Sequence, residues 1–388
     1  FIDRDGTLIK HVELLHKPED LELYEFSSPA LGKVNRSDYL CIMITNQSVV
    51  ARNLCDITTI HSIHNKLETL LGMESSYLDD IYFCPHHPDS GYPGENPVYK
   101  TECECRKPKT GLIEKAVLRY NVDRESSWFI GDSTSDIQTG VNAGMNTILV
   151  RTGNGGKDGK YTITPDFVFN DLMEGVEFIL EGKSKFDKAA KEIIKHVDLD
   201  NPLNIITIGG LARSGKSTFV KCLKDIFERQ NITVTVVSLD NWLHGTEDRT
   251  DSMTVRERYR YKSIEEDMVK LMNEGGVQIR IYDSYSRTVK NGCSLTIKKP
   301  GVVIVEGVPA LDIEGLRRIS TVCIYCETDE QERRERFYTF YRWKNFTENQ
   351  IEQLYDKRMS DEFPIIVNSK QYADIELYRD EIKVKRSL

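Results

Sequence analysis

The sequence predicts an α/β protein made of two doubly wound parallel-sheet domains in tandem. Short apolar runs alternate with amphipathic helical stretches along most of the chain, which is the pattern of βαβ units. Polar motifs directly follow several of these runs, where ligands collect in sheets of this kind. The 388 residues are enough for two cores of ordinary size. We expect a first domain over residues 1–182, a linker helix over 183–202 and a second domain over 203–388.

Composition narrows the classes of partner and the compartment. The formal net charge is −9, from 52 Lys and Arg against 61 Asp and Glu, which weighs against a polynucleotide substrate. The sequence has no apolar run near the length of a membrane span and no signal peptide, so we expect no membrane partner. Nine cysteines, three of them close to histidines, indicate a reducing compartment and a metal site rather than disulfides. We therefore expect a cytoplasmic protein and, because a motif follows Phe1 at once, a gene that starts a few residues earlier.

The predicted strands of the first domain are each followed by polar groups. Phe1-Ile2 runs into DRDGT, LCIMIT (40–45) into NQS, and WFI (128–130) into GDSTSD, with a further strand over 146–150. Parallel strands bring their carboxyl ends to one edge of the sheet. The polar residues that fall at or just past such ends are Asp3, Asp5, Thr45, Lys107, Asp132 and Asp136.

The segments between these strands are predicted to be helices and loops. A helical pattern covers residues 58–71, and we place its His61 and His64 at the surface. Residues 152–160, TGNGGKDGK, have the composition of a flexible loop. A short strand and a closing helix over 164–182 are expected to complete the domain.

The carboxylates at this edge suit phosphoryl transfer to a carboxylate. Several acidic groups in one pocket need a divalent cation, and an oxygen-only donor set favours Mg²⁺. The cation and a lysine together would neutralise a phosphate dianion, so that a carboxylate can attack phosphorus. A second acid two residues along the chain can protonate the leaving oxygen and then activate water.

The stretch CPHHPDSGYPGENPVYKTECECRKP (84–108) contains a predicted metal site. Its CxH and CxC pairs, separated by a loop, form a Cys₃His set that suits a structural zinc ion with no open position for water. Either His86 or His87 satisfies this spacing. The loop runs directly into Arg106-Lys107-Pro108, so a metal here would hold the lysine in place.

Four motifs identify the family that the first domain resembles. DRDGT, ITNQS, the lysine of CRKP and GDSTSD resemble, in order, the motifs of the capless haloacid dehalogenase-like phosphatases. The resemblance implies Asp3 as nucleophile, Asp5 as general acid/base, and Thr45 and Lys107 as phosphate binders. It implies that Mg²⁺ is bound by Asp3, the backbone carbonyl of Asp5, Asp132 and, in support, Asp136.

The cysteine-rich insert is similar to the zinc-bearing branch of this family, which includes heptose 1,7-bisphosphate and histidinol phosphatases. That branch implies Cys84, His86, Cys103 and Cys105 as the zinc ligands. The loop VVARN departs from the glycine-containing sequence usual in the branch. We assign phosphate and substrate binding to Asn46, Arg52 and Arg106, which lie on the short loops expected to set specificity.

The second domain opens on a phosphate-binding loop. An apolar strand over 203–208 runs into GGLARSGKST, a GxxxxGKS motif followed by a helix. The backbone N–H groups of such a loop wrap phosphates, its lysine reaches the β- and γ-phosphates, and its serine binds Mg²⁺. The residues assigned to ATP are Gly210, Arg213, Ser214, Gly215, Lys216, Ser217 and Thr218.

The order of motifs after this loop resembles the uridine kinase and phosphoribulokinase group. SLD, YDSYSR (282–287), VVIVEG and TDxxxRxxR follow one another as in that group. The resemblance implies roles for the following residues: Asp240 as base, Glu306 near Mg²⁺, Asp283 and Arg287 near the acceptor, and Arg333 and Arg336 in a lid over ATP. A basic and aromatic segment, TVRERYRYK (254–262), replaces the acceptor segment of uridine kinases, so a nucleoside acceptor is not supported. We assign no chemistry to residues beyond 345.

The leading hypothesis is a bifunctional enzyme. One half is a Mg²⁺-dependent phosphatase with a structural zinc, acting on a small sugar phosphate such as a heptose bisphosphate. The other is an ATP-dependent kinase for a small sugar or related metabolite. Two alternatives remain open: a polynucleotide 3′-phosphatase/5′-kinase, and a histidinol-phosphatase-like enzyme with a regulatory nucleotide-binding domain. The sequence leaves the oligomeric state undetermined.

Overall fold

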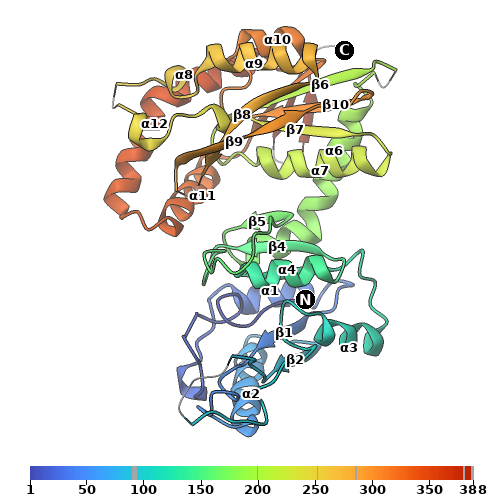
Figure 1. Cartoon of the computed structure of the whole chain (residues 1–388), viewed down its shortest axis with the longest axis vertical. Coiled ribbons are helices and arrows are strands. Elements are labelled where there is room, and N and C mark those ends of the chain that lie inside the picture. The colour runs from blue at the N-terminus through green and yellow to red at the C-terminus, as the bar shows by residue number, and fades with distance from the viewer. Residues whose placement is uncertain (90–93, 199, 251, 285, 379–380, 386–388) are drawn as a thin grey trace. The chain divides into compact units, whose positions relative to one another are not determined.

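The computed structural model describes residues 1–89, 94–198, 200–250, 252–284, 286–378 and 381–385 (Figure 1). The chain divides into two compact parts, unit 1 (Phe1–Glu181) and unit 2 (Gly182–Leu388). Each is an α/β unit with a parallel sheet, as the sequence predicts. None of the helices within these described ranges is long and apolar enough to cross a membrane.

The sheet of unit 1 is parallel, and Ile2 lies at its centre. Ile2 pairs with Met43 on one side and with Ile130 on the other, so the strand order is β2-β1-Ile2-β3-β4-β5. The predicted first strand is thus present at its expected place, as bridges rather than as a full strand. The strands are β1 (Ile42–Asn46), β2 (Asp80–Cys84), β3 (Trp128–Gly131), β4 (Asn146–Val150) and β5 (Phe167–Phe169).

Local capping explains where several helices of unit 1 begin. Asp56 accepts a hydrogen bond from the Thr59 backbone N–H at the start of α2, and Ser133 and Asp136 form a reciprocal capping box at the start of α4. The helices are η1 (Pro18–Asp20), α1 (Ser27–Val34), α2 (Ile57–Met73), α3 (Gly111–Tyr120), α4 (Thr134–Asn142), α5 (Leu172–Glu177) and the π-helical turn η2 (Phe178–Gly182).

The main sheet of unit 2 has the order β13-β12-β11-β6-β10-β7. All its pairs are parallel except β12 with β13, an antiparallel edge that the sequence analysis did not predict. The strands are β6 (Leu203–Gly209), β7 (Val234–Ser238), β10 (Gly301–Glu306), β11 (Val322–Glu327), β12 (Ile375–Tyr378) and β13 (Glu381–Val384). A separate antiparallel hairpin joins β8 (Gly276–Asp283) to β9 (Thr288–Thr296).

The helices of unit 2 include two long ones near the C-terminus, which Figure 1 shows in orange and red. The helices are α6 (Lys183–Ile194), α7 (Lys216–Arg229), η3 (Leu239–Trp242), η4 (Thr246–Asp248), α8 (Val255–Arg258), α9 (Tyr261–Glu274), α10 (Glu314–Ile319), α11 (Glu330–Trp343), α12 (Glu348–Ser369) and η5 (Lys370–Tyr372).

Helix α6 does not behave as the linker expected over 183–202. Its Ala189, Ala190 and Ile193 are buried in one core cluster with Phe219 and Leu223 of α7. A helix with an apolar stripe is stable when that stripe packs against a partner. The many lysines on its other face concealed this stripe in the sequence, and the helix belongs to unit 2.

Candidate active sites

Three carboxylates and a lysine meet at the carboxyl edge of the unit 1 sheet. Asp3 follows Ile2, and Asp132 and Asp136 follow β3, the latter within the first turn of α4. One oxygen from each carboxylate lies within 4.8 Å of the other two. The Lys107 Nζ atom lies 2.8 Å from Asp3 Oδ1 and 2.5 Å from Asp136 Oδ1. All four side chains are buried, so the predicted site residues do come together.

The charges of this cluster are not balanced within the protein. Burial, followed by repulsion from Asp136, raises the pKa of Asp3 to about 7. Burial, and then repulsion from Asp136 and Asp3, also raises the pKa of Asp132. Burial opposes the charge of Lys107, but Asp136 and Asp3 raise its pKa above the ordinary value. One lysine cannot neutralise three carboxylates, and oxygen donors at this spacing fit a divalent cation such as Mg²⁺.

The loop at 152–160 is part of this site, which corrects the expectation of a flexible segment. The Asn154 backbone N–H and Nδ2 donate to Asp132 Oδ2 at 2.6 and 3.0 Å. A Cβ atom at Gly6 or Gly153 would lie 2.3 or 2.2 Å from the same oxygen, and both residues have positive φ. The glycines therefore permit close approach of two loops to Asp132 rather than mobility.

Asp5 lies in a separate hydrogen-bonded network beside the cluster. Arg4 Nη2 donates to Asp5 Oδ1 at 3.0 Å, and Gln47 Nε2 donates to Asp5 Oδ2 at 2.9 Å. Gln47 Nε2 also donates to Thr45 Oγ1 at 2.9 Å, so it links two of the predicted site residues. Sequence reasoning missed Arg4 and Gln47, although both stand inside the motifs that it identified.

His64 is buried rather than at the surface, which corrects the expectation for it; His61 is exposed as expected. The His64 Nε2 atom lies 3.3 Å from Arg4 Nη1, and the ring meets Phe83 edge-on. Burial, and then the charge of Arg4, lowers the pKa of His64 to about 3. A neutral imidazole can accept a hydrogen bond from Arg4, so His64 supports the network around Asp5.

Asn46 holds the backbone of Lys107, and its expected role in phosphate binding stays a prediction. Its Oδ1 accepts from the Lys107 N–H at 3.0 Å, and its Nδ2 donates to the Lys107 carbonyl at 3.2 Å. The Arg106 Nη1 atom donates to the His86 carbonyl at 3.1 Å. Burial lowers the pKa of Arg106.

The four predicted zinc ligands converge, and the structure distinguishes the two histidines. Cys84, His86, Cys103 and Cys105 each place one donor atom within 4.8 Å of the others. The three sulfur–sulfur distances are 3.2 to 3.6 Å, near the roughly 3.8 Å edge of a tetrahedron with zinc–sulfur bonds of about 2.3 Å. His87 Nδ1 instead accepts from the Asp89 N–H at 3.1 Å. The donor set therefore fits a tetrahedral ion through His86.

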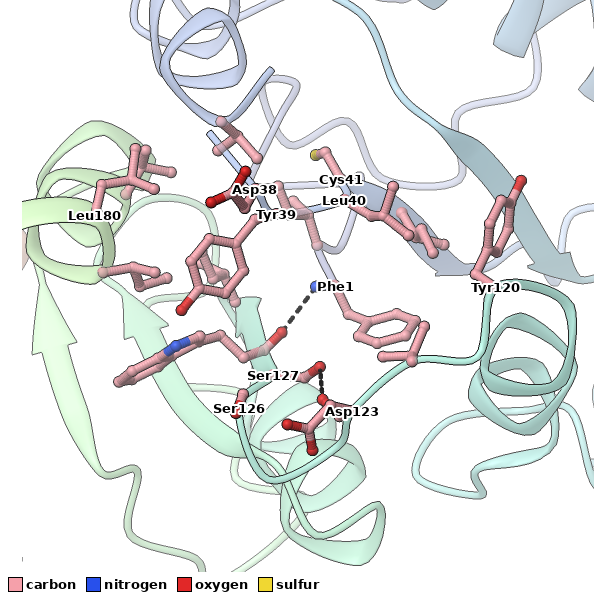
Figure 2. Close-up of a pocket in the computed structure, with 18 of the residues that line it drawn as sticks. Phe1, Asp38, Tyr39, Leu40, Cys41, Tyr120, Asp123, Ser126, Ser127 and Leu180 are labelled. Carbon is pink, nitrogen blue, oxygen red and sulfur yellow. Dashed lines mark hydrogen bonds between the residues drawn. The ribbon is translucent and has the colours of Figure 1, made fainter. Parts of the chain in front are cut away.

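A cavity of unit 1 lies away from the acidic cluster and the cysteine-rich loop. It has a volume of about 290 Å³ and is lined by the segments that precede or begin the central strands (Figure 2). Figure 2 shows Phe1, Tyr39, Cys41 and Ser127 around it, with the Phe1 amino group donating to the Trp128 carbonyl at 2.8 Å. Its lining contains none of the acidic cluster, so the chemistry of unit 1 belongs to the opposite edge of the sheet.

In unit 2 the phosphate-binding loop lies between β6 and α7. Gly210, Arg213 and Gly215 have φ of 136°, 69° and 88°, and a Cβ atom at Gly210 would lie 2.2 Å from the Cys326 carbonyl oxygen. The Lys216 Nζ atom donates to the carbonyl oxygens of Gly210 and Leu211 at 2.8 and 2.7 Å, which folds the loop around the ammonium group. The remaining predicted residues of the loop are Ser214, which is buried, Ser217, which is exposed, and Thr218, which is half-buried.

A pocket of about 170 Å³, here called the P-loop pocket, opens beside this loop. Lys216, Ser217, Asp240 and Glu306 all line it, as the sequence predicts. Burial, and then the charge of Asp240, raises the pKa of Glu306, which accepts a hydrogen bond from Ser238 Oγ at 2.7 Å. Burial lowers the pKa of Lys216. A triphosphate with its Mg²⁺ would supply the charges that these groups lack.

Asp240 is positioned by a buried tyrosine. The Tyr259 hydroxyl donates to Asp240 Oδ1 at 3.0 Å, and burial raises the pKa of that tyrosine well above the ordinary value. Tyr259 comes from the basic and aromatic segment at 254–262, as does Arg258, which also lines the pocket. The segment that sets this chain apart from uridine kinases therefore forms the surroundings of Asp240.

The two arginines predicted to form a lid, Arg333 and Arg336, lie on α11 and do not line the P-loop pocket. Arg333 is buried and donates to both oxygens of Glu330 at 2.8 and 2.7 Å and to Tyr355 of α12 at 3.2 Å. Arg336 pairs with Glu332 at 2.5 Å on the same helix. Neither is among the residues that line the P-loop pocket, so the assignment of these arginines to a lid over ATP stays a prediction.

Of the two predicted acceptor residues, only Arg287 faces the P-loop pocket. Asp283 accepts from Lys290 Nζ at 2.5 Å and from the Ser286 N–H at 3.0 Å, and so stabilises the turn of the β8–β9 hairpin. Sequence reasoning missed several lining residues, most of which lie in a loop or on helices outside the quoted motifs, although Tyr282 stands inside YDSYSR. These are Arg249, Tyr282, Tyr341, Lys344, Arg358 and Glu362.

Comparisons with known proteins agree with this division. The HAD-hydrolase-like family model matches residues 104–175, and the phosphoribulokinase/uridine kinase family model matches residues 205–381. A D-glycero-D-manno-heptose-1,7-bisphosphate 7-phosphatase of Thermosynechococcus vestitus is 35% identical over 186 residues, which are 46% of this chain and 93% of that protein. A D-glycero-α-D-manno-heptose-1,7-bisphosphate 7-phosphatase of Photorhabdus laumondii is 37% identical over 155 residues, 40% of this chain and 82% of that protein.

Solved structures match each half separately. A D,D-heptose 1,7-bisphosphate phosphatase from B. bronchiseptica, crystallised with magnesium and phosphate, is 32% identical and covers 46% of this chain and 96% of its own, with a TM-score of 0.40. A possible uridine kinase from Bacillus stearothermophilus is 19% identical and covers 45% of this chain and 96% of its own, with a TM-score of 0.35. On the sequence relatives and family models, the chain belongs through its N-terminal half to the haloacid dehalogenase-like phosphatases, among the homologues of the heptose-bisphosphate phosphatases, and its C-terminal half is a domain of the phosphoribulokinase/uridine kinase type.

Proposed function

We propose that unit 1 hydrolyses a phosphate ester of a small phosphorylated sugar, and that a heptose 1,7-bisphosphate-like molecule is its substrate. The observation that carries this proposal is the 2.8 Å contact between Asp3 Oδ1 and Lys107 Nζ inside a cluster of three carboxylates. The name and identity of the relatives support the class of substrate.

In the proposed reaction Asp3 attacks phosphorus, the bond to the sugar oxygen breaks, and Asp5 gives that oxygen a proton. Asp5 then takes a proton from water, which attacks the aspartyl phosphate and releases phosphate. Thr45 and Lys107 bind the phosphate oxygens, and Arg52 and Arg106 hold the rest of the substrate. Mg²⁺, held by Asp3, Asp132, the Asp5 carbonyl and Asp136, would supply the positive charge that lets a carboxylate approach a phosphate.

We further propose that Cys84, His86, Cys103 and Cys105 bind a structural zinc ion. A closed Cys₃His set has no open position for water, so the ion would stabilise the loop and take no part in the reaction. Lys107 follows Cys105 by two residues, and a fixed loop would therefore fix the phosphate-binding lysine. All nine cysteines have free thiols, which is consistent with zinc binding and with the expected cytoplasmic location.

We propose that unit 2 is an ATP-dependent kinase for a small metabolite. Asp240 takes the proton of the acceptor hydroxyl, whose oxygen attacks the γ-phosphorus as the bond to ADP breaks. The loop around Lys216 would hold the β- and γ-phosphates, and Ser217 and Glu306 would hold Mg²⁺. The contact of Asp240 with Tyr259 in a pocket shared with Lys216 supports catalysis over nucleotide sensing.

One pair of variants tests both halves. Phosphate release is measured over sugar bisphosphates, histidinol phosphate and a 3′-phosphorylated oligonucleotide, and ADP release over sugars, sugar phosphates and nucleosides. Asp3→Asn should abolish phosphate release and leave ADP release intact, and Lys216→Ala should do the reverse. Retained phosphate release in Asp3→Asn would remove Asp3 as nucleophile, and ATP binding without turnover on any acceptor would favour a regulatory unit 2.

A further inference from the structure

Arg4 stands between the two aspartates of the DRDGT motif and is completely buried. Its exposed fraction is 0%, and it is the largest fully buried side chain among the residues that the structure describes. Taking a guanidinium group out of water is costly unless the protein supplies hydrogen-bond acceptors and a counter-charge. The partners of Arg4 therefore indicate what its burial achieves.

The side chain of Arg4 holds Asp5 together with Gln47. Arg4 Nη2 donates to Asp5 Oδ1 at 3.0 Å and to Gln47 Oε1 at 2.8 Å. Gln47 Nε2 donates to the other carboxylate oxygen, Asp5 Oδ2, at 2.9 Å. Each of the three side chains thus contacts the other two. Both oxygens of Asp5 have a donor, while 22% of its side chain stays exposed for a substrate.

Arg4 also sets the orientation of the Gln47 amide. Because Oε1 faces the guanidinium, Nε2 faces Asp5 and Thr45, and it donates to Thr45 Oγ1 at 2.9 Å. The reverse orientation would place the amide NH₂ group against the guanidinium, with two donors facing each other. A hydroxyl that accepts a hydrogen bond keeps its own proton free to donate. The hydroxyl proton of Thr45 is therefore available for a phosphate oxygen.

A neutral histidine supports the far side of the guanidinium. His64 Nε2, on α2, lies 3.3 Å from Arg4 Nη1. Burial, and then the charge of Arg4, lowers the pKa of His64 to about 3, so the imidazole is uncharged near neutral pH and can accept from Arg4. The ion pair of Arg4 is formed with Asp5. The charge of this arginine is thus directed at the carboxylate that the proposed reaction uses.

The backbone of Arg4 makes a separate contact with the nucleophile. Its N–H donates to Asp3 Oδ1 at 2.7 Å, the oxygen that lies 2.8 Å from Lys107 Nζ. A substitution at Arg4 removes the side-chain contacts to Asp5 and Gln47 and keeps this N–H. Variants of Arg4 can therefore separate the support of Asp5 from that of Asp3.

We propose that Arg4 is a positioning residue of the phosphatase, which holds the Asp5 carboxyl group for proton transfer directly and through Gln47. The inference rests on the proposed function of unit 1 and adds two residues to it. Asp5 gives its proton to the sugar oxygen as the bond from that oxygen to phosphorus breaks, and later takes a proton from water. Arg4 exchanges no proton, because a guanidinium group stays charged in proteins.

The dependence on the leaving group tests this role in the full-length protein. A sugar bisphosphate that the wild type hydrolyses releases an alkoxide, which needs a proton, whereas p-nitrophenyl phosphate releases a phenolate, which does not. The value of kcat/KM covers the steps up to transfer of the phosphoryl group to Asp3. Arg4→Met should lower it about 100-fold for the sugar bisphosphate and less than about 10-fold for p-nitrophenyl phosphate.

Three further variants accompany Arg4→Met, and thermal melting checks that each is folded. Gln47→Met should show the same pattern with a smaller loss, about 10-fold for the sugar bisphosphate, and it decides the question if Arg4→Met does not fold. Arg4→Lys, which keeps the charge but not the fork of donors, should lie between the wild type and Arg4→Met. Arg36→Met, which changes an exposed arginine of unit 1, should leave both values unchanged.

Two kinds of failure are distinguishable in this experiment. Equal losses on the two substrates in the folded variants would mean that Arg4 and Gln47 only support the fold, and would overturn the inference while leaving the phosphatase standing. Absence of phosphate release by the wild type, or full activity of Asp3→Asn, would reject the proposed function and the inference with it.

Discussion

In unit 1 three buried carboxylates surround one lysine, whereas in the P-loop pocket of unit 2 seven cations face three carboxylates. Both sites are proposed to move a phosphoryl group, and each lacks the charge that its ligand would bring. The acidic cluster fits a divalent cation, and the basic pocket fits phosphate anions. The comparison indicates that each site is built around the charge of a ligand that it would bind: a metal cation in unit 1 and phosphate groups in unit 2.

The two sites also differ in how their elements are held. The lysine of unit 1 is fixed from three directions: by Asn46 on its backbone, by Asp3 and Asp136 on its side chain, and by the cysteine cluster two residues before it. The seven cations of the P-loop pocket come from loops, helices and the hairpin turn that are separate along the chain. We therefore expect the phosphatase activity of unit 1 to fall when the residues that position Lys107 are removed. In unit 2 we expect the removal of charged side chains from the P-loop pocket to have the larger effect.

The largest expected effect comes from the zinc cluster. Cys103→Ser should lower phosphatase activity at least about 100-fold, because a displacement of Lys107 by about 1 Å costs that much in a positioned site. Metal content and phosphate release measure the effect, and ADP release should stay unchanged. Cys55→Ser, which alters a thiol of unit 1 outside the cluster, is the control. His86→Ala should release the metal and His87→Ala should retain it; the opposite pattern would contradict the ligand set.

A smaller loss is expected from Asn46→Ala. Removing both hydrogen bonds to the Lys107 backbone should lower kcat about 10- to 100-fold, with a lesser change in KM. Asn35→Ala is a matched control, because Asn35 clamps the backbone of Tyr77 in the same two-bond manner, at 3.1 and 3.0 Å, among exposed residues. Steady-state phosphate release measures both. Wild-type kcat in Asn46→Ala would show that Lys107 needs no such support.

A substitution of Arg333 tests whether this side chain of α11 binds ATP or only stabilises the fold of unit 2. Arg333→Met should lower the free energy of unfolding of unit 2 by about 2 kcal/mol, because it removes buried hydrogen bonds to Glu330 and Tyr355. Arg336→Met, which breaks a surface pair, should cost about 1 kcal/mol or less. Neither should change KM for ATP. Urea denaturation and ATP kinetics measure the effects, and a raised KM for ATP at unchanged stability would restore Arg333 to a lid.

The smallest effect is expected from Lys344→Met, which removes a repelled charge. The pKa of Lys344 in the folded protein, about 7, lies below its ordinary value, so the unfolded chain binds that proton more tightly. Its charge therefore destabilises the fold most below pH 7, and the penalty fades as pH rises toward the ordinary lysine pKa. The variant should melt a few degrees higher below pH 7, about 2 °C or more, and the difference should shrink at alkaline pH.

The control for the melting experiment is a lysine that lacks the charged surroundings of Lys344. Arg213, Arg287 and Arg358 repel it, Asp283 attracts it, and the Ser284 carbonyl accepts its hydrogen bond. Lys262→Met changes a lysine that is exposed on α9 and should not alter Tm with this pH dependence. A lower Tm for Lys344→Met at every pH would mean that its hydrogen bond outweighs the repulsion.

Sequence reasoning located most strand ends, and therefore most residues of the two candidate active sites. β3, β4 and β6 lie within one residue of the predicted runs, because buried strands of a parallel sheet are continuous apolar segments. Asp3, Lys107 and Asp132 were predicted from their place at or past such runs, Lys216 from the phosphate-binding motif, and Asp240 and Glu306 from the resemblance to the kinase group. Their convergence follows from the parallel sheet itself, which brings every carboxyl end to one edge.

The failures have a common origin in contacts between distant segments. Asn154 sits in a glycine-rich loop that looked mobile, and Arg358 and Glu362 come from a helix without a motif. Arg333 lies in the motif that resembles a lid, but in this structure it forms hydrogen bonds with Glu330 and Tyr355. A side chain in a motif carries its chemistry in the sequence, but its partner depends on which remote segment packs against it.

By itself the sequence determined the fold class, the two families and the residues that could carry phosphoryl transfer. These follow from hydrophobic periodicity and from short motifs, which are local properties of the chain. Only the tertiary structure shows that His86 rather than His87 joins the cysteine cluster and that Asn46 hydrogen-bonds the backbone of Lys107. It also shows that several cationic side chains line the same pocket as Asp240. These features depend on contacts between segments that are far apart in the sequence. Such contacts determine which polar and charged groups are buried and which of them have a hydrogen-bond or charge partner.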